Sequence, residues 1–324
     1  MPFVSSMPAA VISQLADRAS PVDGGEGKPL DEPFGLGFDS KGRLLVVELT
    51  QGRLLTLHSD GSLSVVRLDF KGREPFNGPH NLAVLPDGDV LVADTWTGRV
   101  RKVEPASGIV SDVPGFGVPA ERARAAGPYS ITLDSGGSRL YVADLRRIHA
   151  IDLRTGTSRA VAGNGQKGIP ADGAVAAEAP LVEPRAVAPD SRGNVYILER
   201  GGHALRVVDG QGRIRTVVNV SGKKGPPVEA RDAREAFLNG PKHLCVDADD
   251  NVLIADAENN VVSKYSPHDG SLVRVAGTGK AGTAGVGGPP EACELTRPHG
   301  VLVGPDGAIY IADTYNHRVL KIAR

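Results

Sequence analysis

The 324-residue chain has little of several features that mark particular protein classes. Its two cysteines are too few for a disulfide framework, and Cys245 lies in the apolar run HLCVD, where a buried thiol is typical. Aromatic residues make up 4%, which disfavours a surface on which single-stranded nucleic acid stacks. A formal charge of -1 gives no global reason to expect nucleic acid or an acidic membrane surface as a partner.

Long hydrophobic runs are also missing. No window approaches the roughly 18 apolar residues that a membrane helix needs, and the first 20 residues lack a basic head followed by an apolar stretch. We therefore expect a soluble, cytoplasmic and monomeric protein that has no membrane segment. Glycine (41) and proline (24) are plentiful, which indicates many turns.

A repeated unit runs through the chain: a proline opens an apolar strand, a turn follows, and a second strand ends in an acid. The proline and the acid are 15 residues apart in five copies and 16 in the third. The six copies span residues 33–48, 79–94, 128–144, 184–199, 241–256 and 298–313. Each unit continues into a third strand and mostly a fourth, and four short strands joined by tight turns make one propeller blade. The sequence thus predicts an all-β, six-bladed β-propeller of four-stranded antiparallel blades.

The last blade has only three strands before the chain stops at Arg324, which would leave an unpaired sheet edge. The segment AAVISQLADR at 9–18 resembles the outer strands of other blades. We predict that it supplies the missing strand and closes the ring. The predicted organisation is a tail at 1–8 and a single propeller at 9–324.

The wording of these units, best seen in PHGVLVGPDGAIYIADTYNHRV at 298–319, resembles the NHL-repeat family of six-bladed propellers. The resemblance covers essentially the whole chain and implies the fold. It implies little about function, because propellers of this type serve as protein-binding, RNA-binding, sensing and enzymatic modules.

In such a propeller the inner strands begin at the mouth of the central channel, so the residues that follow each proline should surround it. These positions are mostly polar and differ between blades, whereas a purely structural requirement would tend to repeat one residue type. The turn after each second strand should open on the same face. The ligand-binding residues predicted from these positions are Phe34, Asn81, Trp96, Arg146, Arg185, Lys242 and Tyr315.

The acids that end the second strands occupy the same place in every blade, which favours a shared structural task over catalysis. We expect their carboxylates to accept backbone N–H groups from the following turn. These acids are Glu48, Asp94, Asp144, Glu199, Asp256 and Asp313.

Three histidines, His80, His243 and His299, fall within two ring positions of the mouth. Converging imidazoles can hold zinc at about 2.0 to 2.1 Å and leave a coordination position open for water or substrate. In that hypothesis Arg200 and Tyr129 act as the electrophile or the acid/base group. Part of this set is similar to the peptidylglycine amidating lyases, and the resemblance implies zinc ligands at His80 and His299 and a functional arginine at Arg200, although Arg185 stands where those enzymes have a third ligand.

Three functions remain open from the sequence. The first is binding of a peptide, a polar or anionic small molecule or a protein partner at the mouth, where Arg146, Arg185, Arg200 and Lys242 favour an anion. The alternative is a zinc-dependent lyase or hydrolase. The third is RNA binding through the same basic face, with nucleic acid not expected as the main partner.

Overall fold

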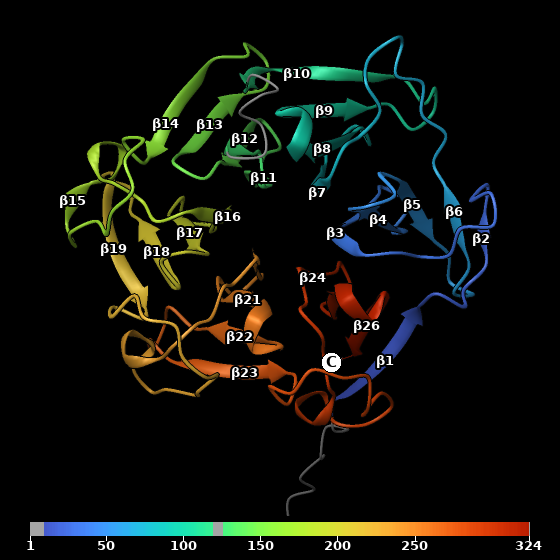
Figure 1. The fold of residues 1–324 in the computed structure, drawn as a ribbon. Helices are drawn as coiled ribbons and strands as arrows, with labels where there is room; N and C mark the ends of the chain where they lie inside the picture. The colour runs from blue at the N-terminus through green and yellow to red at the C-terminus, as the bar shows by residue number, and fades with distance from the viewer. Residues whose placement is uncertain (1–9, 119–125, 324) are drawn as a thin grey trace, which may run out of the picture.

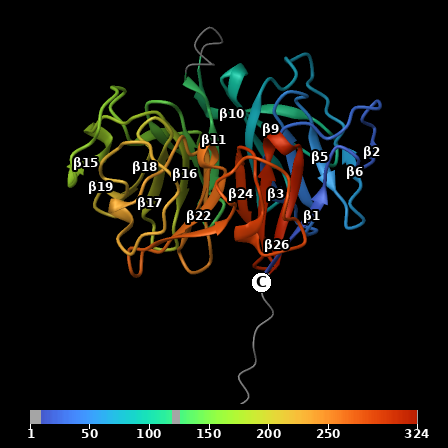
Figure 2. The ribbon, with the colours of Figure 1, turned by 60° about the horizontal axis from the view of Figure 1, so that its bottom comes forward.

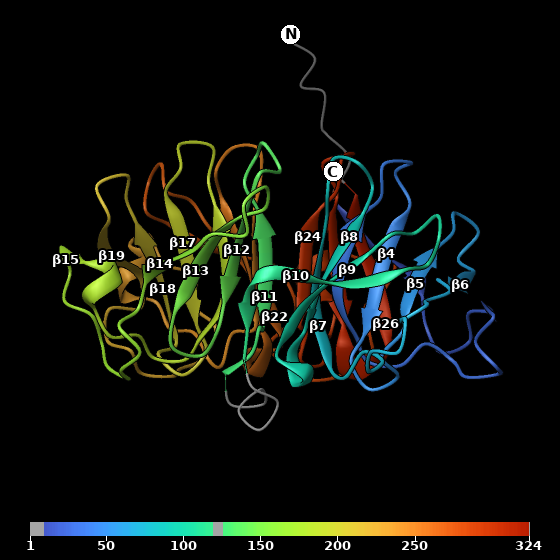
Figure 3. The ribbon, with the colours of Figure 1, turned by 90° about the horizontal axis from the view of Figure 1, so that it is seen from above.

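The structure is a computed structural model that describes residues 10–118 and 126–323. Six sheets surround a central axis, and the chain passes once around the ring from blade 1 to blade 6 (Figure 1). In side view the inner strands run along the axis, so the first residue of each lies at one face of the ring (Figure 3). The predicted all-β, six-bladed propeller is confirmed.

The blades repeat one strand order from the axis outward. Blade 1 contains β3 (Pro33–Phe38), β4 (Leu44–Glu48), β5 (Leu54–Leu57) and β6 (Leu63–Val65). Blade 2 contains β7 (Pro79–Val84), β8 (Val90–Asp94), β9 (Arg99–Val103) and β10 (Val110–Gly117). Blade 3 contains β11 (Ser130–Leu133), β12 (Arg139–Ala143), β13 (Ile148–Asp152) and β14 (Ser158–Ala162).

The second half of the ring follows the same plan. Blade 4 contains β16 (Pro184–Pro189), β17 (Val195–Glu199), β18 (Ala204–Val208) and β19 (Arg213–Val218). Blade 5 contains β20 (His243–Val246), β21 (Val252–Asp256), β22 (Val261–Tyr265) and β23 (Leu272–Ala276). Blade 6 contains β24 (Gly300–Val303), β25 (Ile309–Asp313), β26 (Arg318–Ala323) and β1 (Val11–Ala16). Two-residue strands add to blades 1 and 4, as β2 (Val22–Asp23) and β15 (Ala174–Val175).

The predicted closure of the ring by the N-terminal strand is confirmed. Strand β1 pairs with β26 in antiparallel register, with Val11 opposite Ala323 (Figure 2). The other edge of β1 is covered by the loop before blade 6, because Ile12 N–H donates to Gly288 O (3.1 Å) and Ile12 O accepts from Gly287 N–H (2.8 Å). The predicted tail at 1–8 lies outside the described residues.

The hydrophobic core lies between blades. Blades 1 and 2, for example, share a buried layer in which Leu45 and Val47 pack with Leu82 and Val92. A comparable layer joins each neighbouring pair around the ring, including blade 6 with blade 1. Each blade buries apolar side chains on both faces, and these layers form the core. The residues at the beginning of the inner strands are therefore not needed for the core and can bind a ligand.

The acids at the ends of the second strands fasten the loop that leads into each blade. In five blades the carboxylate accepts the N–H of the residue two positions before that blade's proline, as Asp94 does from Asn77 (2.7 Å). Among the described residues only Asp144 of blade 3 accepts backbone N–H groups from the following turn, those of Arg146 and Arg147. In blades 2, 5 and 6 the following turn donates a side-chain group to the acid, as Thr97 does to Asp94. The expected structural task is thus present, but the donor expected from the sequence was wrong in five blades, because the proline folds the preceding loop back over the acid.

Candidate functional site

The residues that directly follow the prolines form a ring, here called the mouth, at the face where the inner strands begin. Its members are Phe34, His80, Tyr129, Arg185, Lys242 and His299. The Arg185 guanidinium lies 3.7 Å from the centre of the Tyr129 ring, and Tyr129 meets His80 edge-on at 5.1 Å. His80 in turn meets Phe34 at 5.0 Å, and Phe34 stacks on His299 at 4.3 Å. Five of the six predicted positions are therefore in continuous contact.

Small residues bring the inner strands of blades 6 and 1 close enough for this contact. A Cβ added at Gly300 would lie 2.1 Å from the carbonyl oxygen of Phe34, so a larger residue there would push the strands apart. The approach places Phe34, 5% exposed, against the imidazoles of both neighbouring blades.

The two mouth histidines are held in the same way. Nδ1 of His80 donates to Gly78 O, and Nδ1 of His299 donates to Arg297 O, each at 2.7 Å. Burial lowers the pKa of both imidazoles well below the ordinary value, and the nearby charges of Arg185 and Lys242 lower it further. Both rings are therefore neutral at physiological pH, with Nε2 as a hydrogen-bond acceptor.

Two buried cations occupy the other side of the mouth. Arg185 is 8% exposed, and burial lowers its pKa to about 10. The side chain of Lys242 is 10% exposed, and burial together with the charge of Arg185 lowers its pKa to about 7. Lys242 lies 3.9 Å from Glu258, whose carboxylate also pairs with Arg297 at 2.6 Å. Among residues 10–118 and 126–323 no carboxylate oxygen lies within 4.0 Å of the Arg185 guanidinium, and the charge of Glu183 acts on it from further away.

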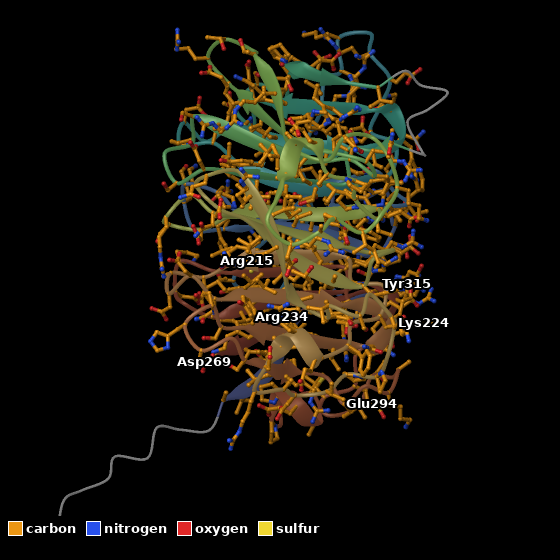
Figure 4. The ribbon with its side chains drawn as sticks, turned by 90° about the vertical axis from the view of Figure 1, so that its left-hand side faces the viewer. Arg215, Lys224, Arg234, Asp269, Glu294 and Tyr315 are labelled. Atoms are coloured by element: carbon orange, nitrogen blue, oxygen red, sulfur yellow. The ribbon has the colours of Figure 1, made fainter. Side chains whose placement is uncertain are left out.

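The remaining predicted rim residues lie further from the axis. The Trp96 ring is 6.2 Å from His80, and the Tyr315 ring is 5.7 Å from His299. Arg200 is exposed and reaches Glu183 at 4.0 Å, while Arg146 is exposed nearby. Figure 4 shows Tyr315 on the same face of the ring as Lys224, with Asp269 towards the opposite face. The aromatic and cationic rim residues thus share one face.

Asn81 and His243 lie deeper than the mouth. Asn81 Nδ2 lies 2.9 Å from His243 Nε2, and Asn81 Oδ1 accepts from the N–H of Ile131 (2.9 Å). Both residues line a chamber of about 460 Å³ that is formed by the inner strands of all six blades. Burial lowers the pKa of His243 to about 4, so its ring is neutral. The structure therefore separates His243 from the other two predicted histidines.

This arrangement gives no support to the zinc hypothesis. Within the described part of the chain, no group of three or more His, Cys, Asp or Glu residues is placed to hold a metal ion. His80 and His299 both pack on Phe34, whereas His243 contacts Asn81 in the channel. The zinc site at His80, His243 and His299, with Arg200 and Tyr129 in catalytic roles, remains a prediction.

Sequence reasoning missed the residues that directly precede the prolines. All six have positive φ, and this residue is glycine in blades 2, 3 and 5. In the other three blades it is charged: Glu32 (φ 44°), Glu183 (φ 53°) and Arg297 (φ 46°). The sequence contained a signal for this position, because the residue before the repeated proline is either glycine or charged. Glycine there indicates a positive φ, and a charged residue at the same place indicates a role for its side chain.

Comparison with known proteins places the chain in a family. The family model for the teneurin NHL domain matches residues 71–323. The chain belongs to the teneurin NHL domain family. Human teneurin-1 is 26% identical over 290 residues, which cover 76% of this chain and 10% of teneurin-1. This NHL domain therefore spans about a tenth of the length of that relative.

Solved structures agree on the fold of the NHL domain. A Bacteroides thetaiotaomicron protein of unknown function superposes with a TM-score of 0.75 at 16% identity, covering 97% of this chain and 76% of that chain. An auxiliary nutrient binding protein from the same organism superposes with a TM-score of 0.69 at 15% identity, with the same coverage. Among the described residues no helix is long and apolar enough to cross a membrane.

Proposed function

We propose that the mouth of this NHL domain binds an anionic group that is attached to an aromatic or apolar group, on a peptide, a small molecule or a protein partner. The observation that carries the proposal is Arg185, which is buried beside Tyr129 and has no carboxylate oxygen within 4.0 Å among the described residues. Burying a cation without a counter-charge is costly, and a ligand carboxylate would supply that charge. A guanidinium suits this role because its planar fork matches a carboxylate.

The aromatic side of the mouth supports the second half of the proposal. Phe34, His80, Tyr129 and His299 offer ring faces and edges within one contact chain that ends at Arg185. A ligand that carries an aryl group next to a carboxylate can therefore pack its ring on these residues and pair its carboxylate with Arg185. Electrostatic attraction would come from Lys242 as well, since the carboxylate next to it, Glu258, is shared with Arg297.

The test uses a reporter that the chain already contains. Trp96 is the single tryptophan of the sequence and contacts His80 at the mouth, so its fluorescence should respond to a bound ligand. We expect 3-phenylpropionate to bind at least tenfold more tightly than the neutral 3-phenylpropionamide, because only the acid gains a charge-assisted hydrogen bond of about 1.5 to 3 kcal/mol.

Arg185→Met should remove most of that preference. The matched control is Arg215→Gln, which changes an exposed arginine of β19 in the same blade, away from the mouth (Figure 4). Circular dichroism melts show whether each variant is folded. Equal affinity for the acid and the amide in the unmodified protein would refute the proposal without any variant.

A further inference from the structure

Glu183 occupies a strained backbone position that three other blades fill with glycine. A non-glycine residue with positive φ carries a conformational cost, and a following proline restricts its backbone further. Glycine would avoid this cost, as it does at Gly78, Gly127 and Gly240. A charged residue at this position therefore needs a compensating role for its side chain.

The other two charged residues at this position have such roles within the fold. Arg297 forms a 2.6 Å ion pair with Glu258 and lies 5.4 Å from the centre of the Tyr315 ring. The carboxylate of Glu32 accepts a hydrogen bond from the Thr50 hydroxyl.

Glu183 contacts two exposed cations. It pairs at 3.0 Å with Lys167, whose side chain is 55% exposed, and at 4.0 Å with Arg200, whose side chain is 44% exposed. Exposed ion pairs of this kind contribute little to stability. The role of the Glu183 side chain is therefore not explained by the fold alone.

Its location supplies an explanation. Glu183 and Glu258 line a cavity of about 440 Å³ between blades 4 and 5, together with Arg200, His203 and Lys224. The charge of Glu183 also acts on the Arg185 guanidinium, whose pKa it raises against the effect of burial. A carboxylate thus lies next to the buried cations of the mouth. A ligand with a negative and a positive group could pair with the cations and with this carboxylate.

We infer that the mouth selects a zwitterionic ligand, with an aromatic α-amino acid head group as the chemical class, and that Glu183 is the specificity-determining residue for its ammonium group. This inference rests on the proposed function. The ligand carboxylate pairs with Arg185 and Lys242, the ammonium with Glu183 and Glu258, and the ring packs on the aromatic side of the mouth. The strain at Glu183 is retained because it places a carboxylate beside the cations.

The experiment compares ligands that differ by one group, with Trp96 fluorescence as the readout. L-phenylalanine carries the ammonium, 3-phenylpropionate lacks it, and phenethylamine lacks the carboxylate. We expect phenylalanine to bind about tenfold more tightly than either of the others. The amide of the dipeptide Phe-Asp presents the same three groups on a peptide. Tighter binding of this dipeptide than of phenylalanine would assign the site to a peptide N-terminus, and weaker binding would assign it to a free amino acid.

Glu183→Gln should remove the preference for phenylalanine over 3-phenylpropionate and leave the affinity for 3-phenylpropionate unchanged or higher. Glu32→Gln is the matched control, since Glu32 has the same backbone conformation on the other side of the ring, and it should keep the preference. Glu183→Gly and Glu32→Gly should each raise the melting temperature by about 2 °C through release of strain, and only the former should alter selectivity.

The outcomes separate this inference from the proposed function. If 3-phenylpropionate binds and phenylalanine binds no better, the zwitterion inference is overturned and anion binding stands. A preference that survives in Glu183→Gln would assign the ammonium to another residue and overturn the role of Glu183. If none of the probes binds, both proposals fail.

Discussion

Blades 2 and 5 have the same local backbone but different charges around it. In each, the second strand ends in an aspartate that starts one 3-10 turn, with φ and ψ of -86° and 79° at Asp94 and of -88° and 79° at Asp256. Asp94 pairs with the buried Arg101 at 3.1 Å. Within the described part of the chain, Asp256 accepts hydrogen bonds only from the N–H of Asn239 and the amide of Asn259, and burial raises its pKa to about 7.

The mouth shows the same contrast. Blade 2 presents the neutral imidazole of His80, whereas blade 5 presents Lys242, a cation whose pKa is lowered to about 7. The comparison teaches that turns, prolines and buried apolar layers maintain the repeat, while the charge at each equivalent position varies from blade to blade. Electrostatic differences between blades are thus where the function of this domain is to be sought.

The largest effect is expected from removing the paired aspartate. Asp94→Asn leaves the buried Arg101 guanidinium without its internal partner and should lower the free energy of unfolding by about 3 kcal/mol, the low end for a broken buried ion pair, because Asp112 still contacts Arg101. Asp256→Asn leaves no arginine unpaired and should not lower the free energy of unfolding, because it also removes the cost of burying a group that the unfolded chain would ionise. Urea unfolding at neutral pH measures the free energy of unfolding of both variants. Equal losses of stability would show that the ion pair with Arg101 does not cause the difference between the two blades.

A second effect concerns pH. Because burial raises the pKa of Asp256 from 3.8 to about 7, the folded protein holds a proton that the unfolded chain has lost. The contribution of protonated Asp256 to the free energy of unfolding is fully present below the pKa of the unfolded chain, 3.8, and is lost as the pH rises through the folded pKa of about 7. Between about pH 5.5 and 7 the free energy of unfolding should fall by about 1.5 kcal/mol for this reason. Asp256→Asn should remove this part of the slope in urea unfolding at several pH values, and a slope that is unchanged in the variant would assign it to other groups.

The smallest effect is on binding. Lys242 has a pKa lowered to about 7, so it is charged below that pH and neutral above it. The affinity for 3-phenylpropionate should therefore fall about fivefold between pH 6 and 8.5, through loss of about 1 kcal/mol of charge-assisted attraction.

Lys242→Met should bind weakly with no such pH dependence, whereas His80→Gln should keep the dependence, because His80 is neutral over that range. Trp96 fluorescence measures all three proteins. The role of Lys242 would be excluded by a pH profile that persists in Lys242→Met.

The fold could be predicted from the sequence because its signals are local. The unit at 79–94 contains both β7 and β8, and the missing strand of blade 6 pointed to residues 9–18, where β1 lies. Proline, tight turns and apolar strands act within a few residues, so their spacing carries the blade plan. The NHL resemblance is confirmed by the family model that matches residues 71–323.

The site could be predicted only in part, because its geometry depends on contacts between blades. The positions after the prolines were correctly placed together, but nothing local shows that Phe34 packs on both imidazoles or that His243 contacts Asn81 inside the channel. Glu183 was overlooked because its positive φ shows only when it is compared with the glycines that occupy the same position in three other blades. Neighbouring strands, not local propensity, determine these side-chain directions.

The seam between β1 and β26 also determines how the ring would respond to force. Val11 is paired directly with Ala323, so the two strands begin their shared ladder at the same end. A force that pulls Val11 and Ala323 apart would break the residue pairs of the ladder one after another. It would not shear all pairs at the same time. Ile12 comes next in the register, and its own N–H and C=O groups bond to Gly288 and Gly287 in the loop on the other side of β1. Pulling should therefore open the propeller at blade 6 first, with Ile12 as the point that resists.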